Sequence, residues 1–154
     1  MHIKALAKTV AIVFSQFQQK HPNVCACVLF VPETSSLADD VAIDDDGNIY
    51  ATDAVRNLIW KVSSDGSQVS ILTDNTTLQT NPKSYVLGSV GLNGIAYHRD
   101  GFLLVAHMGG DALFRVSLDG KEVTKVIVRG GVLFGDGITL VSPDQLAVAS
   151  LWSG

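Results

Sequence analysis

Short apolar runs that alternate with polar residues recur after the first 36 residues of the chain and predict β-strands. In the stretch 58–63 the apolar side chains of Leu58, Trp60 and Val62 fall on one face of a strand, and the stretch 112–116 (ALFRV) has the same alternation. Asp-Gly pairs separate many of these runs, and glycine adopts the positive φ that a tight hairpin requires. The pattern predicts an all-β chain with many hairpins.

The predicted strands belong to an internal repeat. The stretch DDVAIDDDGNIYATDAVRNLIWKVSSDGSQVSIL starts at Asp39, and NGIAYHRDGFLLVAHMGGDALFRVSLDGKEVTKV starts at Asn93, 54 residues later, with no gap in the alignment. A third copy, DGITLVSPDQLAVAS, starts at Asp136 and stops after about two strands. Between the first two copies, residues 74–91 are polar and lack periodicity, which predicts a long loop at one rim.

Each full copy predicts four short strands joined by turns, which is typical of a β-propeller blade. A β-sandwich with similar hairpins is the alternative. The expected strands of the two full copies are Val41–Asp44, Ile49–Asp53, Leu58–Ser63, Val69–Thr73, Gly94–His98, Leu103–His107, Ala112–Leu118 and Val123–Val128.

A propeller typically needs four to eight blades to close, whereas this chain predicts about two and a half to three. One strand of an earlier blade is expected at Cys27–Pro32. We therefore expect an incomplete propeller, from a fragment or a truncated gene product. Its uncovered blade edges predict self-association or pairing with another chain.

Residues 1–36 are expected to form a separate N-terminal segment, helical or irregular, ahead of a propeller unit at 37–154. Its apolar run Val10–Phe14 is too short to span a bilayer. The net charge of −4 and the lack of a Lys/Arg cluster argue against nucleic-acid binding. Cys25 and Cys27 lie two residues apart in a chain without a zinc-ligand motif, and nothing in the sequence indicates a compartment.

The repeats also resemble a known family. LADDVAIDDDGNIYATDAVRNLIWKVSSDG, GLNGIAYHRDGFLLVAHMGGDALFRVSLDG and GDGITLVSPDQLAVAS are similar to successive blades of the SMP-30/gluconolactonase/LRE-like family, above all its plant members. NHL-repeat and strictosidine synthase-like propellers share the blade pattern. The resemblance starts at about Leu37 and implies a six-bladed, calcium-dependent propeller that hydrolyses lactones or phosphoesters.

The resemblance also implies a metal site in the central channel. Asn93 of an Asn-Gly motif and Asp136 of an Asp-Gly motif stand where the family has metal ligands, and the pair Asp39-Asp40 stands where another blade faces the same cavity. The family's first-blade glutamate has no clear counterpart, because Glu33 precedes the wrong strand.

The residue types agree with this implied site. Asp39, Asn93 and Asp136 start the three repeats at one equivalent position, so a propeller would direct all three toward one axis. Oxygen ligands of this kind suit Ca²⁺ or another divalent metal, and Asp136 could also act as the general base for a water that attacks an ester or lactone.

Other interpretations remain open for the same residues. Asn93 and Asp136 could form turns before the inner strands, and Asp39-Asp40 could be a solvated turn pair. Residues 44–48 are expected to form a hairpin turn, because they lack the spacing of a calcium loop. The alternative function is a non-catalytic, NHL-like propeller that serves as a protein-interaction scaffold.

Overall fold

The computed structural model describes residues 36–79, 90–130 and 134–150, and Leu37–Gly154 forms one compact unit. The expected N-terminal segment, the strand at Cys27–Pro32 and Glu33 lie outside the described residues. None of the helices in the described part is long and apolar enough to cross a membrane.

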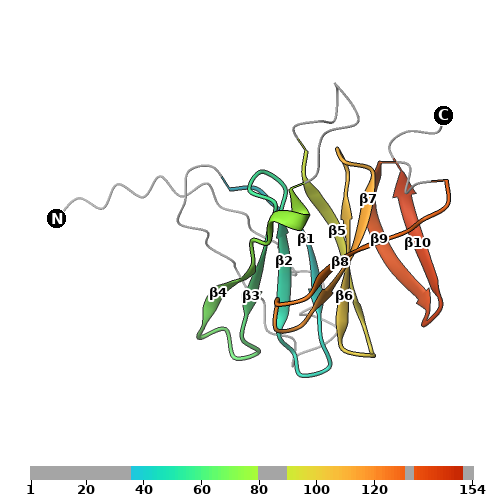
Figure 1. Ribbon diagram of the computed structural model, residues 1–154. Helices are drawn as coiled ribbons and strands as arrows, with labels where there is room; N and C mark the ends of the chain where they lie inside the picture. The colour runs from blue at the N-terminus through green and yellow to red at the C-terminus, as the bar shows by residue number, and fades with distance from the viewer. Residues whose placement is uncertain (1–35, 80–89, 131–133, 151–154) are drawn as a thin grey trace, which may run out of the picture. The chain divides into compact units, whose positions relative to one another are not determined.

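The described residues form three antiparallel sheets in which consecutive strands are neighbours (Figure 1). The first sheet is the first predicted blade, the second sheet is the second, and the third sheet contains two strands. This confirms the prediction of four-stranded blades followed by a partial one. The strands are β1 (Ala38–Ile43), β2 (Ile49–Asp53), β3 (Leu58–Val62), β4 (Val69–Thr73), β5 (Leu92–His98), β6 (Phe102–His107), β7 (Ala112–Ser117), β8 (Val123–Val126), β9 (Gly135–Ser142) and β10 (Gln145–Ser150).

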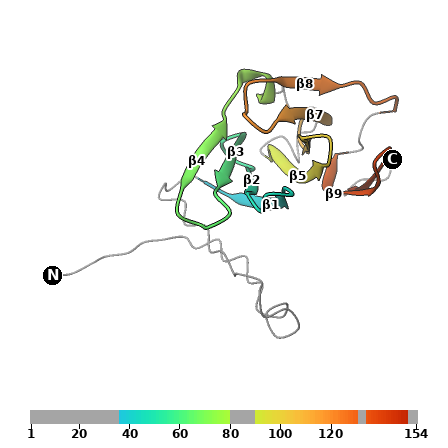
Figure 2. The ribbon, with the colours of Figure 1, turned by 90° about the horizontal axis from the view of Figure 1, so that it is seen from below.

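The inner strands β1, β5 and β9 pack beside one another, while β4 and β8 form the outer edges of their blades (Figure 2). Apolar side chains fill the space between the blades. Tyr50 and Phe114 are fully buried and Trp60 is 7% exposed. A larger cluster lies around Phe114, and a smaller one packs Ile138 of the third sheet against the second blade.

The segment between the first two blades contains more structure than the predicted loop. Thr76–Leu78 forms a 3₁₀ turn, η1, and the side chain of Asn75 accepts a hydrogen bond from the amide of Thr77 at its start. Leu78 is fully buried in the core cluster. A single apolar residue in a polar stretch carries no periodic signal, which is why the sequence pattern did not reveal this contact.

The predicted Asp-Gly turns close the hairpins. Gly47 and Gly101 have φ values of +82° and +81°, and they end the inner hairpins of the first two blades. Gly66 and Gly120 repeat this geometry at the outer hairpins. The positive φ at each position explains why glycine recurs in the repeat.

The carboxylate of Asp44 organises the first inner hairpin. It is 7% exposed, and it accepts hydrogen bonds from the Tyr50 hydroxyl at 2.8 Å, from the amides of Asp46 and Asn48 and from the Asn48 side chain. Burial alone would raise the pKa of Asp44, but these hydrogen bonds outweigh it and hold the pKa below its ordinary value. Residues 44–48 thus form the turn expected from the sequence.

Replacement of Asp44 by Asn is expected to remove part of the acid sensitivity of folding. The folded pKa of Asp44 lies below the unfolded value of 3.8, so its stabilising contribution is present above 3.8 and is lost as pH falls through the folded value. At pH 6 the variant should lose about 1–2 kcal/mol, because an amide NH₂ cannot accept the bond that Tyr50 donates. Urea unfolding at pH 6 and pH 3 measures both effects. The exposed Asp144→Asn serves as control, and an equal pH dependence in both variants would contradict the assignment.

Candidate functional site

All three inner strands carry the same irregularity near their first residue, a β-bulge. In each hairpin, two residues of the inner strand stand opposite one residue of its partner. Bulges of this kind redirect side chains and occur frequently beside functional sites. The bulged pairs are Asp39-Asp40 in β1, Asn93-Gly94 in β5 and Asp136-Gly137 in β9. These pairs are the positions that the repeat alignment singled out.

The bulges explain why the inner strands begin earlier than expected. β1 starts at Ala38 and β5 at Leu92, whereas the sequence predicted starts at Val41 and Gly94. Asn93 and Asp136 therefore lie within strands and not in the turns before them. Asp39-Asp40 also lies within a strand and not in a turn, and Asp39 is exposed there. Asn and Asp are rare in regular strands, so in a sequence such a residue at a bulge looks like a turn residue. This is why the strand starts were predicted too late.

The second and third bulges are in direct contact. A Cβ atom added at Gly94 would lie 2.6 Å from the backbone nitrogen of Ile138 and would also overlap the carbonyl oxygen of Asp136. Glycine is thus required at this position, because the backbone of β9 occupies the space of a side chain. This close approach brings Asn93 and Asp136 to the same end of neighbouring strands.

The carboxyl group of Asp39 is affected by the charge of Asp136. Burial raises the pKa of Asp39, and the negative charges of Asp136 and Asp40 raise it further, although part of the Asp39 side chain remains exposed. Like charges near one another disfavour ionisation. A cation or a shared proton between the two carboxyl groups would relieve this repulsion.

Asn93 is 4% exposed and is held at several points. Its side-chain Nδ2 donates to Met108 Sδ at 4.0 Å, and its backbone oxygen accepts a 2.6 Å hydrogen bond from the Thr52 hydroxyl. An amide that donates through Nδ2 keeps its oxygen as an acceptor or ligand. The backbone of Asn93 is thus held by the neighbouring blade, and its side chain contacts its own blade.

Asp40 has a structural role that the sequence did not reveal. Its Oδ1 accepts the amide of Val41 at 2.8 Å, and its Oδ2 accepts the amide of Ile95 in the next blade at 3.0 Å. The carboxylate thus joins the first blade to the second across the bulges. Gly94 stands at the equivalent position of the second blade, where the backbone of β9 approaches directly. Asp40 is therefore committed to backbone groups, and of this pair Asp39 is the one left for the site.

The second strands end in buried polar residues at equivalent positions. Asp53 is fully buried and accepts the amide of Arg56 at 3.0 Å and the indole NH of Trp60 at 3.4 Å. His107 is 3% exposed, its Nδ1 accepts the amide of Gly110 at 3.0 Å, and its Nε2 has no hydrogen-bond partner within the described part of the chain. Burial lowers the pKa of His107, and because Nδ1 accepts the Gly110 amide, the neutral imidazole carries its proton on Nε2.

The donor chemistry at the bulges suits a hard cation. Asp39, Asn93 and Asp136 offer oxygen ligands, and Ca²⁺ completes its six to eight ligands with backbone oxygens and water. Among residues 36–79, 90–130 and 134–150, no group of three or more His, Cys, Asp or Glu side chains is placed to hold a metal. Two carboxylates and one amide fit a calcium ion in ligand type and supply part of its coordination.

Comparisons with known proteins identify the architecture. No family profile matches the chain, and no curated protein matches it by sequence. Among solved structures, the nidogen/laminin complex aligns with a TM-score of 0.60 and 19% identity over 80% of this chain and 43% of its own. Regucalcin from Agrobacterium tumefaciens, described as a calcium-binding protein, aligns with a TM-score of 0.57 and 19% identity over 80% of this chain and 41% of its own.

A luciferin-regenerating enzyme aligns with a TM-score of 0.56 and 17% identity over 81% of this chain and 41% of its own. These are propeller proteins. The chain has a β-propeller fold. It spans about two fifths of the length of the three proteins, and at these identities the likeness extends to the fold alone.

Proposed function

We propose that residues 37–154 are part of a calcium-dependent hydrolase of the SMP-30/gluconolactonase type, which acts on lactones or phosphoesters. The observation that carries this proposal is the recurrence of one bulge in three adjacent inner strands, with Asp39, Asn93 and Asp136 at equivalent positions. The structural similarity to regucalcin and to a luciferin-regenerating enzyme also supports this proposal.

In the proposed reaction Asp136 is the general base. Its carboxylate takes a proton from a water molecule, whose oxygen adds to the carbonyl carbon of a lactone, and the ring C–O bond then breaks as the proton passes to the leaving oxygen. Burial, followed by the neighbouring charge of Asp136, raises the pKa of Asp39 and so favours a proton on the Asp39 carboxyl group. Asn93 orients the substrate or the ion through its amide oxygen. A bound divalent cation would polarise the carbonyl group.

A non-catalytic propeller that binds another protein is the second candidate function. The likeness to the nidogen/laminin complex, with the highest TM-score of the three comparisons, favours it. In this case the acidic residues at the bulges would serve only to set the register of the inner strands. Calcium binding and hydrolysis distinguish the two candidates.

Calcium is expected to raise the melting temperature of the chain, and a chelator is expected to reverse the rise. A ligand at about 100 times its Kd stabilises the folded state by about 2.7 kcal/mol. Asn93→Ala and Asp136→Ala should each abolish most of the shift, while the exposed Asp144→Ala should retain it. Thermal unfolding followed by circular dichroism, with calcium and with EDTA, measures the shift. A full shift in the Asn93 and Asp136 variants would refute the ligand assignment.

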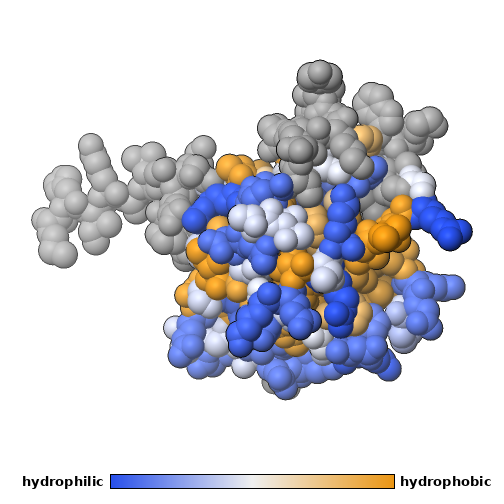
Figure 3. All heavy atoms as spheres, in the orientation of Figure 1, coloured by the Kyte–Doolittle hydropathy of each residue, from blue (hydrophilic) through white to orange (hydrophobic). Residues whose placement is uncertain are grey.

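We propose that the chain self-associates through an exposed blade edge, the outer edge of β10. β10 has no partner strand on its outer side within the described residues, and Val148 is 36% exposed. In the second blade, the corresponding strand β6 is mostly buried. On the face drawn in Figure 3, apolar side chains also lie exposed among polar ones.

A second copy of the chain is expected to cover the edge of β10. Sedimentation should give a mass that rises with protein concentration, because an open strand edge templates pairing. A charge on the edge, introduced as Val148→Lys, should shift the distribution to the monomer. Ile127→Lys, at a residue that is 93% exposed and outside the strands, is the matched control. Equal masses for both variants at all concentrations would exclude β10 as the interface.

A further inference from the structure

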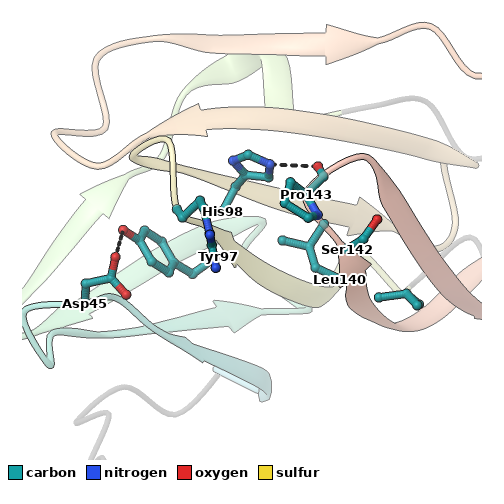
Figure 4. A pocket seen from close by; sticks show the side chains of 8 residues that line it. Asp45, Tyr97, His98, Leu140, Ser142 and Pro143 are labelled. Carbon is teal, nitrogen blue, oxygen red and sulfur yellow. Dashed lines mark hydrogen bonds between the residues drawn. The ribbon is translucent and has the colours of Figure 1, made fainter.

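A cleft of about 700 Å³ lies at the opposite end of the inner strands from the bulges. Its walls come from the turn ends of the three inner hairpins: Asp45 in the turn after β1, the end of β5 with Arg99 of the following turn, and the end of β9 with Pro143 of the following turn (Figure 4). Each of the three sheets thus contributes one hairpin end. The cleft shares no residue with the candidate metal site.

Hydrogen bonds and ring stacking hold the centre of the cleft in place. His98 accepts the amide of Asp100 at Nδ1, 3.1 Å away, so its proton lies on Nε2, which donates to the carbonyl oxygen of Pro143 at 2.8 Å. The imidazole also stacks on the ring of Phe102 with centroids 4.3 Å apart, and the guanidinium of Arg115 covers the other side of that ring. The wall that joins the second and third sheets is therefore pre-formed.

Opposite charges face the cleft from equivalent positions of two blades. Asp45 and Arg99 are related by the repeat, both are exposed, and they form no ion pair with each other in the described structure. Asp45 accepts a hydrogen bond from the Tyr97 hydroxyl at 3.1 Å, and a carboxylate has room for further donors. Arg99 has no hydrogen-bond or ion-pair partner among the described residues, and its five N–H donors match a carboxylate in geometry.

We propose that this cleft binds a small zwitterion with an apolar body, such as an aliphatic amino acid. Its carboxylate pairs with Arg99, its ammonium group pairs with Asp45, and its apolar part lies against Leu140 and Val141. A ligand with one charge would leave one of the two protein charges without a partner of opposite charge, and complementary charge on both sides is what gives selectivity. The proposal is independent of the metal site.

The test uses three probes of matched shape. L-leucine carries both charges, 4-methylpentanoate lacks the ammonium group and 3-methylbutylamine lacks the carboxylate. Each is titrated into the ¹⁵N-labelled chain, and the resonances of Tyr97, His98 and Ser142 are followed. L-leucine should give saturable shifts at these residues and bind about two- to fivefold more tightly than either analogue, the range expected for one exposed ion pair.

Two charge-neutral variants assign the contacts. Arg99→Gln should lose the preference for L-leucine over the amine, and Asp45→Asn should lose the preference over the carboxylate while it keeps an acceptor for Tyr97. Arg129→Gln removes an exposed cation outside the cleft and should behave like the unchanged chain. Shifts that do not saturate, equal affinity for all three probes, or an equal effect of Arg129→Gln would overturn the proposal. Each of these outcomes is separate from calcium binding at the other end of the strands.

Discussion

Phe114→Ala should lower the free energy of unfolding by about 3–5 kcal/mol, the range for loss of a buried phenylalanine ring. Phe114 is fully buried in β7, where it stands opposite Val105 of β6 and Lys125 of β8 and belongs to the main core cluster. The surrounding residues cannot move in to fill the cavity left by the ring, because β7 is hydrogen-bonded to a strand on each side. Domains are commonly stable by only about 5–15 kcal/mol, so this variant should lie near the threshold of folding.

Urea unfolding followed by circular dichroism measures the loss. Ile127→Ala is the control, because Ile127 is 93% exposed and its truncation should change the free energy of unfolding by less than about 0.5 kcal/mol. A loss below about 1 kcal/mol for Phe114→Ala would mean that the blades do not pack around this ring as the structure shows.

Gly94→Ala should separate the third sheet from the second blade. The added Cβ would lie 2.6 Å from the nitrogen of Ile138, and because the obstacle is backbone it cannot rotate away. Overpacking of a filled site costs about 1–3 kcal/mol, and relief of the overlap requires β9 to move. Gly137→Ala is a close control, since it adds the same methyl group at the equivalent bulge, where no heavy atom lies within 4 Å of the new Cβ.

Hydrogen exchange locates this effect as well as measuring it. In Gly94→Ala the amides of β9 and β10 should lose protection, while those of β2 and β3 should keep most of theirs. Gly137→Ala should leave both sets close to their original values. Protection that remains unchanged in β9 of Gly94→Ala would contradict the close contact between the second and third bulges.

Much of the fold could be predicted because the sequence repeats its local signals. The alternation in the strands and the Asp-Gly turns recur 54 residues apart, and they correctly predicted two four-stranded blades and a partial third. Turn glycines were predictable because a positive φ is a local requirement, as Gly47 and Gly101 show.

The bulges and the contacts between blades could not be predicted in the same way. A bulge is defined by how two strands pair. The local sequence around Asp39 or Asn93 does not distinguish a turn from a bulged strand. The cross-blade hydrogen bond of Asp40 depends on the position of Ile95, 55 residues away. One signal was available, because a strand-depleted residue at an equivalent position in all three repeats indicates a shared constraint on the backbone.

The length of the inner strands weakens the electrostatic interaction between charges at the bulges and charges at the turns. From Asn93 at the bulge to Arg99 at the turn, the chain advances through an extended strand, which corresponds to about 20 Å. At physiological salt the Debye length is about 8 Å, so a charge gained or lost at one end is screened before it reaches the other. Substitutions at the turns can therefore change what binds there and leave the raised pKa of Asp39 unaltered. Because the inner strands separate the two ends by more than the Debye length, charged residues at one end can be substituted without a large electrostatic effect at the other.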